Sequence, residues 1–374
     1  GRYPWLDEGI IVPPGENSKT LAQVEGVCSQ LATQEFARGR QLAAVGGGVV
    51  GDLAGFCAAI YQRGTPFVQV PTSLVAQVDS AYGGKTGVDL PAAKNYAGAY
   101  HQPDGVLVDT DALTGLPKAE LVSGWAEVIK TALIAGGRLW KKVSAGVDFT
   151  EPIDPWIVFE CARTKLGVVA ADEREQNVRQ ILNLGHTIGH AIETAAGYGT
   201  LRHGEAVSIG LAGALRLSGN DALHDEVVAV CKQAGLPVRT KGVTVDNVLE
   251  VIRLDKKRVG ETVPFVLVAG PGEVTQGHEV APADLEAAVG FYSKLFATEP
   301  AKVRPGYANF AVAEPPLKLV LIENPGHGGS LNHLGVEVDT TDEVTATNAR
   351  LSDEGMATAT EDEVTCCYAV QDKV

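Results

Sequence analysis

Three histidines carry the strongest chemical signal in the sequence. His186 and His190 are four residues apart in NLGHTIGH, so their side chains share one face if this segment is helical. His203 follows in TLRHGE, after a glycine-containing turn. A catalytic zinc-type site keeps three protein ligands and one open position. The pattern predicts such a metal centre. The HxxxH spacing lacks the internal glutamate of the metalloprotease helix, so peptide hydrolysis is not indicated.

A carboxylate to complete this centre stands in GWAEVIK, at Glu127. The residues around it are mostly apolar, and a buried acid needs a partner. A metal ion is one such partner and an ordinary ion pair is another. The sequence pattern alone leaves both interpretations of Glu127 open.

Two glycine-rich segments could bind phosphate groups. GGGVVG at 46–51 matches GxGxxG between a predicted strand and a predicted helix, which favours a nucleotide, although a tightly packed turn explains it equally well. GGKT at 83–86 is not a phosphate loop of NTPases, because Asp79 occupies the position of the first glycine. Lys85, Lys94 and Asn95 nevertheless lie among glycines, which suits a polar pocket as well as ordinary surface lysines.

The elements that must position these residues fall into three segments. Residues 1–117 alternate short apolar runs (42–45, 67–70, 106–109) with a helical run at 53–61, which predicts an α/β nucleotide-binding domain with a mainly parallel sheet. Residues 118–283 predict a mostly α-helical domain for metal and substrate, with helices over 120–135, 155–171, 178–196, 204–217 and 222–234 and a strand at 263–268. Residues 284–374 are rich in proline and glycine and end acidic, so we expect a separate, partial α+β segment.

Composition narrows the class of partner. The 374 residues carry a net charge of −15, which argues against nucleic acid but not against an anionic small molecule in a local basic pocket. The sequence has no uninterrupted run of about 20 apolar residues, so it predicts no membrane-spanning helix. Four of the six cysteines are scattered within apolar runs, which favours a reducing, cytoplasmic location over a disulfide framework.

The motifs together resemble 3-dehydroquinate synthase, of the sugar-phosphate cyclase superfamily. The resemblance runs over about residues 12–283 and rests on GGGVVGDLAGF, QVPTSLVAQVDSAYGGKTGVD, KNYAGAYHQP, SGWAEVIKTALI, VVAADERE, ILNLGHTIGHAIE and HGEAVSIGL. It implies an enzyme that converts 3-deoxy-D-arabino-heptulosonate 7-phosphate to 3-dehydroquinate and phosphate, a step of aromatic amino-acid biosynthesis. It also implies NAD and one divalent metal, zinc or cobalt, with transient oxidation, β-elimination and aldol closure.

The resemblance assigns roles residue by residue. It implies three metal ligands: Glu127, His186 and His203. It implies NAD contacts from a turn, a loop, a strand end and two lysines: Pro14, Gly15, Glu16, Asn17, Ser18, Lys19, Gly48, Val49, Val50, Gly51, Asp52, Thr72, Ser73, Lys85 and Lys94. It implies a polar catalytic and substrate pocket: Asp79, Lys85, Asn95, Lys130, Lys165, Arg179, Asn183, His190 and Lys256. Arg63 matches an arginine that reaches into the neighbouring subunit's site, which implies a homodimer.

The two ends of the chain depart from this family. A first strand–helix–strand stretch is absent, so we expect an incomplete nucleotide-binding domain, and Pro14 stands where the family has aspartate. From about residue 285 the sequence resembles part of a vicinal-oxygen-chelate domain of the cadmium-induced or arsenic-responsive lyase type. There, His333 matches a metal ligand, and Cys366 and Cys367 match soft-metal-binding thiols.

Alternative functions remain at this stage. A sister cyclase acting on sedoheptulose 7-phosphate or glucose 6-phosphate has no use for Arg179 with Lys165, which the resemblance assigns to a substrate carboxylate. An iron-dependent alcohol dehydrogenase shares the general architecture but does not need phosphate-directed residues such as Lys85. A metalloid-binding protein built on Cys366 and Cys367 is the alternative from a different class.

Overall fold

The computed structural model describes residues 9–91, 93–149, 152–197, 200–240, 264–279, 302–304, 307–312, 317–322, 361–366 and 369–373. The chain divides into two compact units, Gly1–Glu279 and Val280–Val374. The first unit contains every predicted site residue of the synthase-like region. Lys256, His333 and Cys367 lie outside the described residues. The division of the chain into 1–117, 118–283 and 284–374 stays a prediction.

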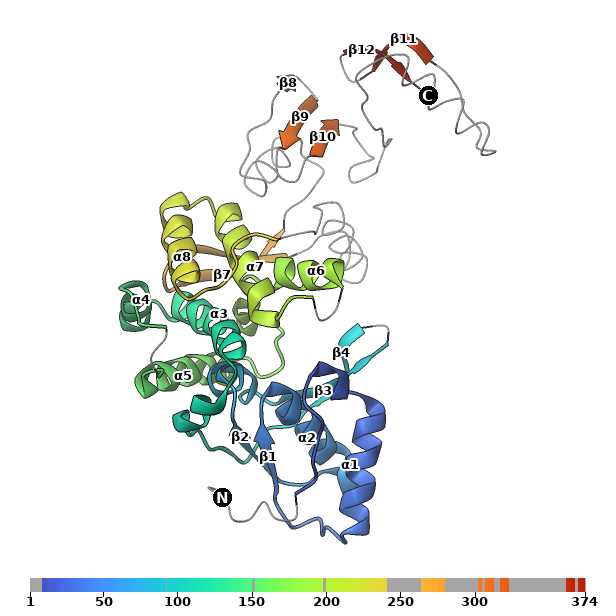
Figure 1. Ribbon diagram of the computed structural model, residues 1–374, viewed down its shortest axis with the longest axis vertical. Helices are drawn as coiled ribbons and strands as arrows, with labels where there is room; N and C mark the ends of the chain where they lie inside the picture. The colour runs from blue at the N-terminus through green and yellow to red at the C-terminus, as the bar shows by residue number, and fades with distance from the viewer. Residues whose placement is uncertain are drawn as a thin grey trace. The chain divides into compact units, whose positions relative to one another are not determined.

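The first part of unit one is an α/β layer built on a parallel sheet in the order β1-β2-β5. The strands are β1 (Leu42–Gly46), β2 (Phe67–Pro71) and β5 (Gly105–Val106). Helix α2 (Gly48–Ile60) packs on β1 and β2, and α1 (Leu21–Thr33) packs on α2 (Figure 1). Apolar side chains of α1 and α2 form a shared core here. The predicted α/β architecture with a parallel sheet is therefore confirmed for this part.

Two local predictions in this layer are wrong. The strand expected over 106–109 ends at Val106, because Asp109 caps the 3-10 helix Thr110–Gly115 by accepting a hydrogen bond from Asp111 N–H. The helix expected over 53–61 begins earlier, at Gly48. The pattern also gave no sign of the antiparallel hairpin of β3 (Lys85–Leu90) and β4 (Ala93–Tyr100). A π-helical turn, Ala76–Ser80, precedes this hairpin.

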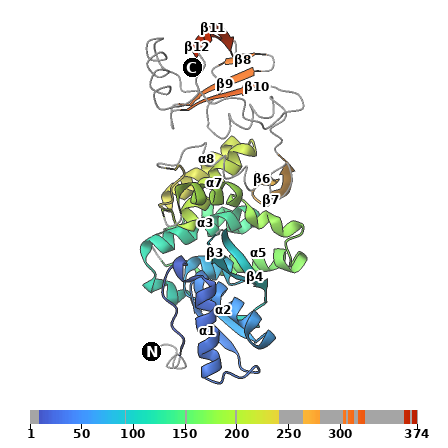
Figure 2. The same cartoon turned by 90° about the vertical axis from the view of Figure 1, so that its right-hand side faces the viewer.

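The second part of unit one is helical and surrounds α3 (Lys118–Ala135). All residues from Ser123 to Ile134 are buried, so α3 lies at the centre of the largest apolar core. Figure 2 shows α7 and α8 next to it. The other helices are α4 (Gly137–Ser144), α5 (Pro155–Ala171), α6 (His186–Ala196), α7 (His203–Leu217) and α8 (Asp221–Gln233). Since α3 is buried from Ser123 to Ile134, the two charged side chains in that stretch, Glu127 and Lys130, require partners.

The single helix expected over 178–196 is wrong. The segment is a 3-10 helix, Val178–Asn183, followed by α6, which begins at His186. Gly185 separates them with a φ of 77°, a left-handed conformation that favours glycine. A side chain there would also meet Leu211 N at 2.9 Å. The break therefore comes from close packing against α7, which helical periodicity alone does not show.

The remaining described elements are strands. The hairpin of β6 (Pro264–Gly270) and β7 (Glu273–Glu279) joins the helical part, where Gly272 N–H donates to Leu133 O at 2.7 Å. In unit two, β8 (Lys302–Arg304), β9 (Tyr307–Val312) and β10 (Leu317–Ile322) form an antiparallel sheet, and β11 (Glu361–Cys366) pairs with β12 (Ala369–Lys373). None of the described helices combines the length and the apolarity that a bilayer crossing requires.

Candidate metal centre

Three helices bring the predicted metal ligands together. His186 is the first residue of α6, His203 is the first residue of α7, and Glu127 lies in the middle of α3. Glycines let these helices approach closely. A side chain at Gly204 would overlap Ser123 O of α3, and one at Gly210 would overlap Gly185 O before α6. Helix–helix packing thus sets the positions of residues that are far apart in the chain.

The nitrogen and oxygen atoms of this group converge on one point. Glu127 Oε1 lies 3.2 Å from His203 Nε2 and 3.5 Å from His186 Nε2. One ligand atom from each residue lies within 4.8 Å of the others. Two imidazole nitrogens and one carboxylate oxygen form the donor set that divalent zinc or cobalt accepts. The residues present therefore fit a divalent cation.

Burial and neighbouring charges shift the pKa values of the three candidate metal ligands. Glu127 is fully buried, and although burial raises the pKa of its carboxyl, Lys130 Nζ at 2.5 Å and the histidines hold it well below its usual value. Burial, followed by the Lys130 charge, lowers the pKa of His186 to about 3, so this ring is neutral as a ligand must be. Burial opposes protonation of His203, but Glu127 and Glu193 raise its pKa to about 10 in the metal-free site.

A line of buried and half-buried charges of alternating sign leads away from Glu127. Lys130 also lies 3.5 Å from the Asp79 carboxylate, and Lys165 pairs with the same carboxylate and donates to Asp79 O at 2.7 Å. Burial raises the pKa of Asp79, but the two lysines outweigh it and lower the pKa. Burial lowers the pKa of Lys165. These four side chains form a polar wall in an otherwise apolar core, beside the candidate metal centre.

A second group of predicted substrate residues contacts residues 173–175, before the 3-10 helix Val178–Asn183. Lys85 pairs with Glu175, and Asn183 Nδ2 donates to the other oxygen of Glu175 at 2.9 Å. Arg179 is buried and donates to Glu173 O and, at 2.9 Å, to Gly83 O. The β3–β4 hairpin is thereby joined to the segment that leads into α6.

A third group contains predicted NAD residues. Lys19 is buried and donates to Asp52 Oδ2 at 2.6 Å and to Asn95 Oδ1. Glu16, in the short 3-10 helix Glu16–Ser18, lies 3.9 Å from Lys19. The Asn95 side chain therefore contacts Lys19, a predicted cofactor residue, although the resemblance placed Asn95 in the substrate pocket.

The glycine loop lies at the carboxyl end of the parallel sheet. Gly46 ends β1, and Gly47 caps α2. A side chain on Gly47 would lie 3.1 Å from Ser73 Oγ, so the loop runs directly beside the end of β2. Glycine backbone at a strand end and a helix N-terminus is the usual cradle of a pyrophosphate. Gly48, Val49, Val50 and Gly51, predicted as a loop, instead form the first turn of α2, so their backbone lies at a helix N-terminus that could hold a dinucleotide phosphate.

Three predicted residues remain: Arg63 lies apart from these groups, whereas Lys94 and His190 border the metal centre. Arg63 is exposed and left-handed (φ 65°), and it precedes β2, at the sheet end opposite Thr72 and Ser73. Lys94 Nζ lies 3.8 Å from Glu193 Oε1. His190, Glu193 and His203 place their ligand atoms within 4.8 Å of one another. Glu193 and Glu175 were missed by sequence reasoning. For Glu193 the signal was available, because it follows His186 by seven residues and so shares its helix face.

Comparison with known proteins decides the family. The family model described as 3-dehydroquinate synthase N-terminal matches residues 9–123, and its C-terminal counterpart matches residues 124–258. A 3-dehydroquinate synthase of Acidithiobacillus ferrooxidans is 43% identical over 283 residues, which is 73% of this chain and 78% of that protein. The chain belongs to the 3-dehydroquinate synthase family.

Solved structures of sister cyclases share this synthase fold. A 2-deoxy-scyllo-inosose synthase complexed with carbaglucose-6-phosphate, NAD+ and Co2+ aligns at 28% identity and a TM-score of 0.63, over 70% of this chain and 75% of that one. The 2-epi-5-epi-valiolone synthase of Streptomyces hygroscopicus, with NAD+ and Zn2+ bound, aligns at 26% identity and a TM-score of 0.67, over 76% and 81%. Residues 275–372 match the glyoxalase, bleomycin resistance protein and dioxygenase superfamily, which confirms the second resemblance.

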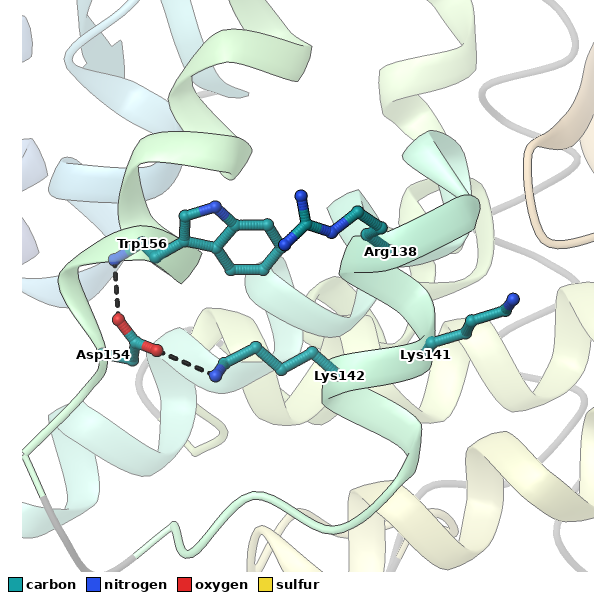
Figure 3. A pocket seen from close by; sticks show the side chains of 5 residues that line it. All are labelled: Arg138, Lys141, Lys142, Asp154 and Trp156. Carbon is teal, nitrogen blue, oxygen red and sulfur yellow. Dashed lines mark hydrogen bonds and ion pairs between the residues drawn. The ribbon is translucent and has the colours of Figure 1, made fainter.

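A surface pocket of about 390 Å³, lined by residues of α4 and the start of α5, includes none of the candidate metal ligands (Figure 3). Arg138 and Lys142 lie over the Trp156 ring, 5.3 and 5.8 Å from its centroid, while Lys141 points away from the ring. Lys142 pairs with Asp154 at 2.8 Å, and Asp154 accepts from Trp156 N–H at 2.9 Å. These contacts cap the N-terminus of α5. The five residues that line the pocket do not include a set of metal ligands.

We expect D154A to destabilise the protein by about 1 kcal/mol at neutral pH, because Asp154 is the N-cap of α5. Its pKa is lowered by Lys142 and by Trp156 N–H. A depressed folded-state pKa means that this stability is present above the ordinary aspartate pKa of about 4 and is lost as pH falls through the folded-state pKa. Urea unfolding at pH 7 and in strong acid measures it. An equal difference between D154A and the unmodified chain at both pH values contradicts the charge-assisted cap.

Proposed function

We propose that this protein is a 3-dehydroquinate synthase, which converts 3-deoxy-D-arabino-heptulosonate 7-phosphate to 3-dehydroquinate and phosphate. The observation that supports it most is the convergence of Glu127, His186 and His203 in a chain of this family, directly beside the ion pairs of Asp79 with the buried Lys130 and Lys165. Such a centre suits polarisation of a hydroxyl and movement of its proton.

A divalent cation held by Glu127, His186 and His203 supplies a Lewis acid for substrate hydroxyls, and NAD at the glycine loop supplies a hydride acceptor and donor. The protein holds each in place. His186 presents Nε2 because its Nδ1 lies 3.2 Å from Leu184 O. Lys130 neutralises the Glu127 charge that remains beside the cation. The hydrogen bond from Lys19 to Asp52 joins the turn around Lys19 to the N-terminal part of α2, where we propose that the nucleotide binds.

Substrate anions require cations in the pocket. We assign the carboxylate to Arg179 and Lys165, and Arg179 Nε is a buried donor without a hydrogen-bond partner among the described residues. We assign the phosphate to Lys85, Asn95, Arg63 and Lys256. Asp79, Lys130 and His190 orient hydroxyls and move protons. Of these, Asn95 is the weakest assignment geometrically, because its side chain contacts Lys19.

The position of Arg63 suggests how two copies of the chain assemble. Its exposed position at the sheet end opposite Thr72 and Ser73 keeps it away from the other predicted substrate residues of its own chain. We propose a homodimer in which Arg63 of one subunit completes the phosphate site of the other. The location we propose is the cytoplasm, in line with four scattered free thiols at Cys28, Cys57, Cys161 and Cys231.

The test is phosphate release from the heptulosonate phosphate by the full chain. We expect release that requires added NAD, stops with a chelator such as EDTA and returns with Zn2+ or Co2+. Glucose 6-phosphate and sedoheptulose 7-phosphate serve as matched substrates without the carboxylate. Turnover of either of these in preference to the heptulosonate phosphate assigns the chain to a sister cyclase. Absence of release with NAD and metal present sinks the synthase proposal.

A further inference from the structure

The two histidines at the metal centre are oriented in the same way. His186 and His203 both direct Nε2 at Glu127 Oε1, at 3.5 and 3.2 Å. Each directs its other ring nitrogen at an oxygen. For His186 this oxygen is Leu184 O, at a hydrogen-bond distance of 3.2 Å from Nδ1, and for His203 it is Glu193 Oε1, at an ion-pair distance of 3.7 Å from Nδ1.

A metal-bound imidazole needs this second oxygen. A neutral ring that gives Nε2 to a cation carries its proton on Nδ1, and the acceptor of that proton fixes the tautomer and the ring orientation. His203 needs such a partner more than His186, because its side chain is 39% exposed while that of His186 is 12% exposed. A carboxylate is also a stronger acceptor than a backbone carbonyl and makes the imidazole a more basic ligand.

Helix α6 places Glu193 where its carboxylate can accept the Nδ1 proton of His203. Glu193 lies one turn after His190 and two turns after His186, on the same face of the helix. Its side chain is 7% exposed, so the carboxylate requires charged partners. Those partners are His203 and Lys94 of β4, at 3.7 and 3.8 Å.

We propose that Glu193 is a positioning residue of the metal centre, holding His203 with its proton on Nδ1 and its Nε2 directed at the cation. This inference rests on the proposed function, since it takes Glu127, His186 and His203 as the ligands. Glu193 acts through His203 and does not itself touch the cation. Its carboxylate also connects α6 to the β3–β4 hairpin through Lys94.

Two other roles for Glu193 give different results. His190, Glu193 and His203 also place ligand atoms within 4.8 Å of one another, so Glu193 could be a ligand of a second set. In that case H190A weakens metal binding as much as E193A. Glu193 could instead serve only to pair with Lys94. In that case E193Q and E193A leave metal affinity unchanged.

The experiment is a Co2+ titration of the full chain against a competing chelator, with the visible spectrum of bound Co2+ recorded. We expect E193Q to weaken Co2+ binding about tenfold and E193A by up to about 100-fold, as for other partners of metal-bound histidines. H190A stays close to the unmodified chain, and the spectrum of saturated E193Q keeps its intensity, since no ligand is lost. E226Q, at an exposed glutamate of α8, is the matched control.

Several outcomes overturn the proposal. Co2+ affinities of E193Q and E193A within about threefold of the unmodified chain do so, because loss of the oxygen that orients a metal-bound histidine lowers metal affinity by more than that. The proposal is also overturned if H190A and E193A weaken Co2+ binding equally and change the visible spectrum of bound Co2+. If E193A does not fold, the isosteric E193Q decides. An unmodified chain that binds Co2+ but releases no phosphate sinks only the synthase proposal, whereas one that binds no Co2+ overturns both.

Discussion

H186A loses its divalent metal and about 10³-fold of its turnover, the largest effect on activity that we expect from a single substitution. Loss of a Lewis acid removes several kcal/mol of transition-state stabilisation, and each 1.36 kcal/mol corresponds to about tenfold in rate. His186 Nε2 lies 3.5 Å from Glu127 Oε1. Its removal leaves one histidine and one carboxylate, one short of the three protein ligands that a catalytic site has.

Metal content by elemental analysis and phosphate release measure this effect together. H224A is the matched control, because His224 lies on α8, where its Nδ1 contacts Asp225 rather than the centre. We expect H224A to keep its metal and its turnover. Full metal content and turnover in H186A would show that the assignment of the centre is wrong.

G210A gives the largest loss of stability that we expect. A methyl group on Gly210 would overlap Gly185 O and lie 2.8 Å from Gly189 N. Both atoms belong to backbone, so no side chain can turn aside and α6 must move away from α7. We expect a loss of at least about 3 kcal/mol, at the upper end of overpacking effects. Since His186 begins α6 and His203 begins α7, the same movement separates the ligands and weakens metal binding.

Thermal unfolding and Co2+ affinity of G210A measure these two consequences. G167A is the matched control, because Gly167 is exposed on α5 and a methyl group there meets nothing within 4 Å. Glycine to alanine at such a position stabilises a helix by about 0.5–1 kcal/mol. Should G210A unfold at the same temperature as G167A, the close approach of α6 and α7 is wrong.

The sequence by itself determined most of the elements. Helical periodicity predicted α5 over 155–171, the bounds that the structure has. Strands β1 and β2 were also predicted to within a residue, because apolar runs between glycine and proline are local signals. The family motifs carried the candidate site residues. Local signals failed where tertiary contact overrides them, as at Gly185, where packing against Leu211 divides the expected long helix.

Only the tertiary structure decided which of these residues meet. Glu127 and His203 are 76 positions apart, as are Lys19 and Asn95, and no periodicity relates such distant residues. Helix packing through Gly204 and Gly210 brings the metal ligands to one point, and the β3–β4 hairpin carries Asn95 to Lys19. The role of Glu193 depends on the same packing, since its helix face was readable in the sequence but its contact with His203 was not.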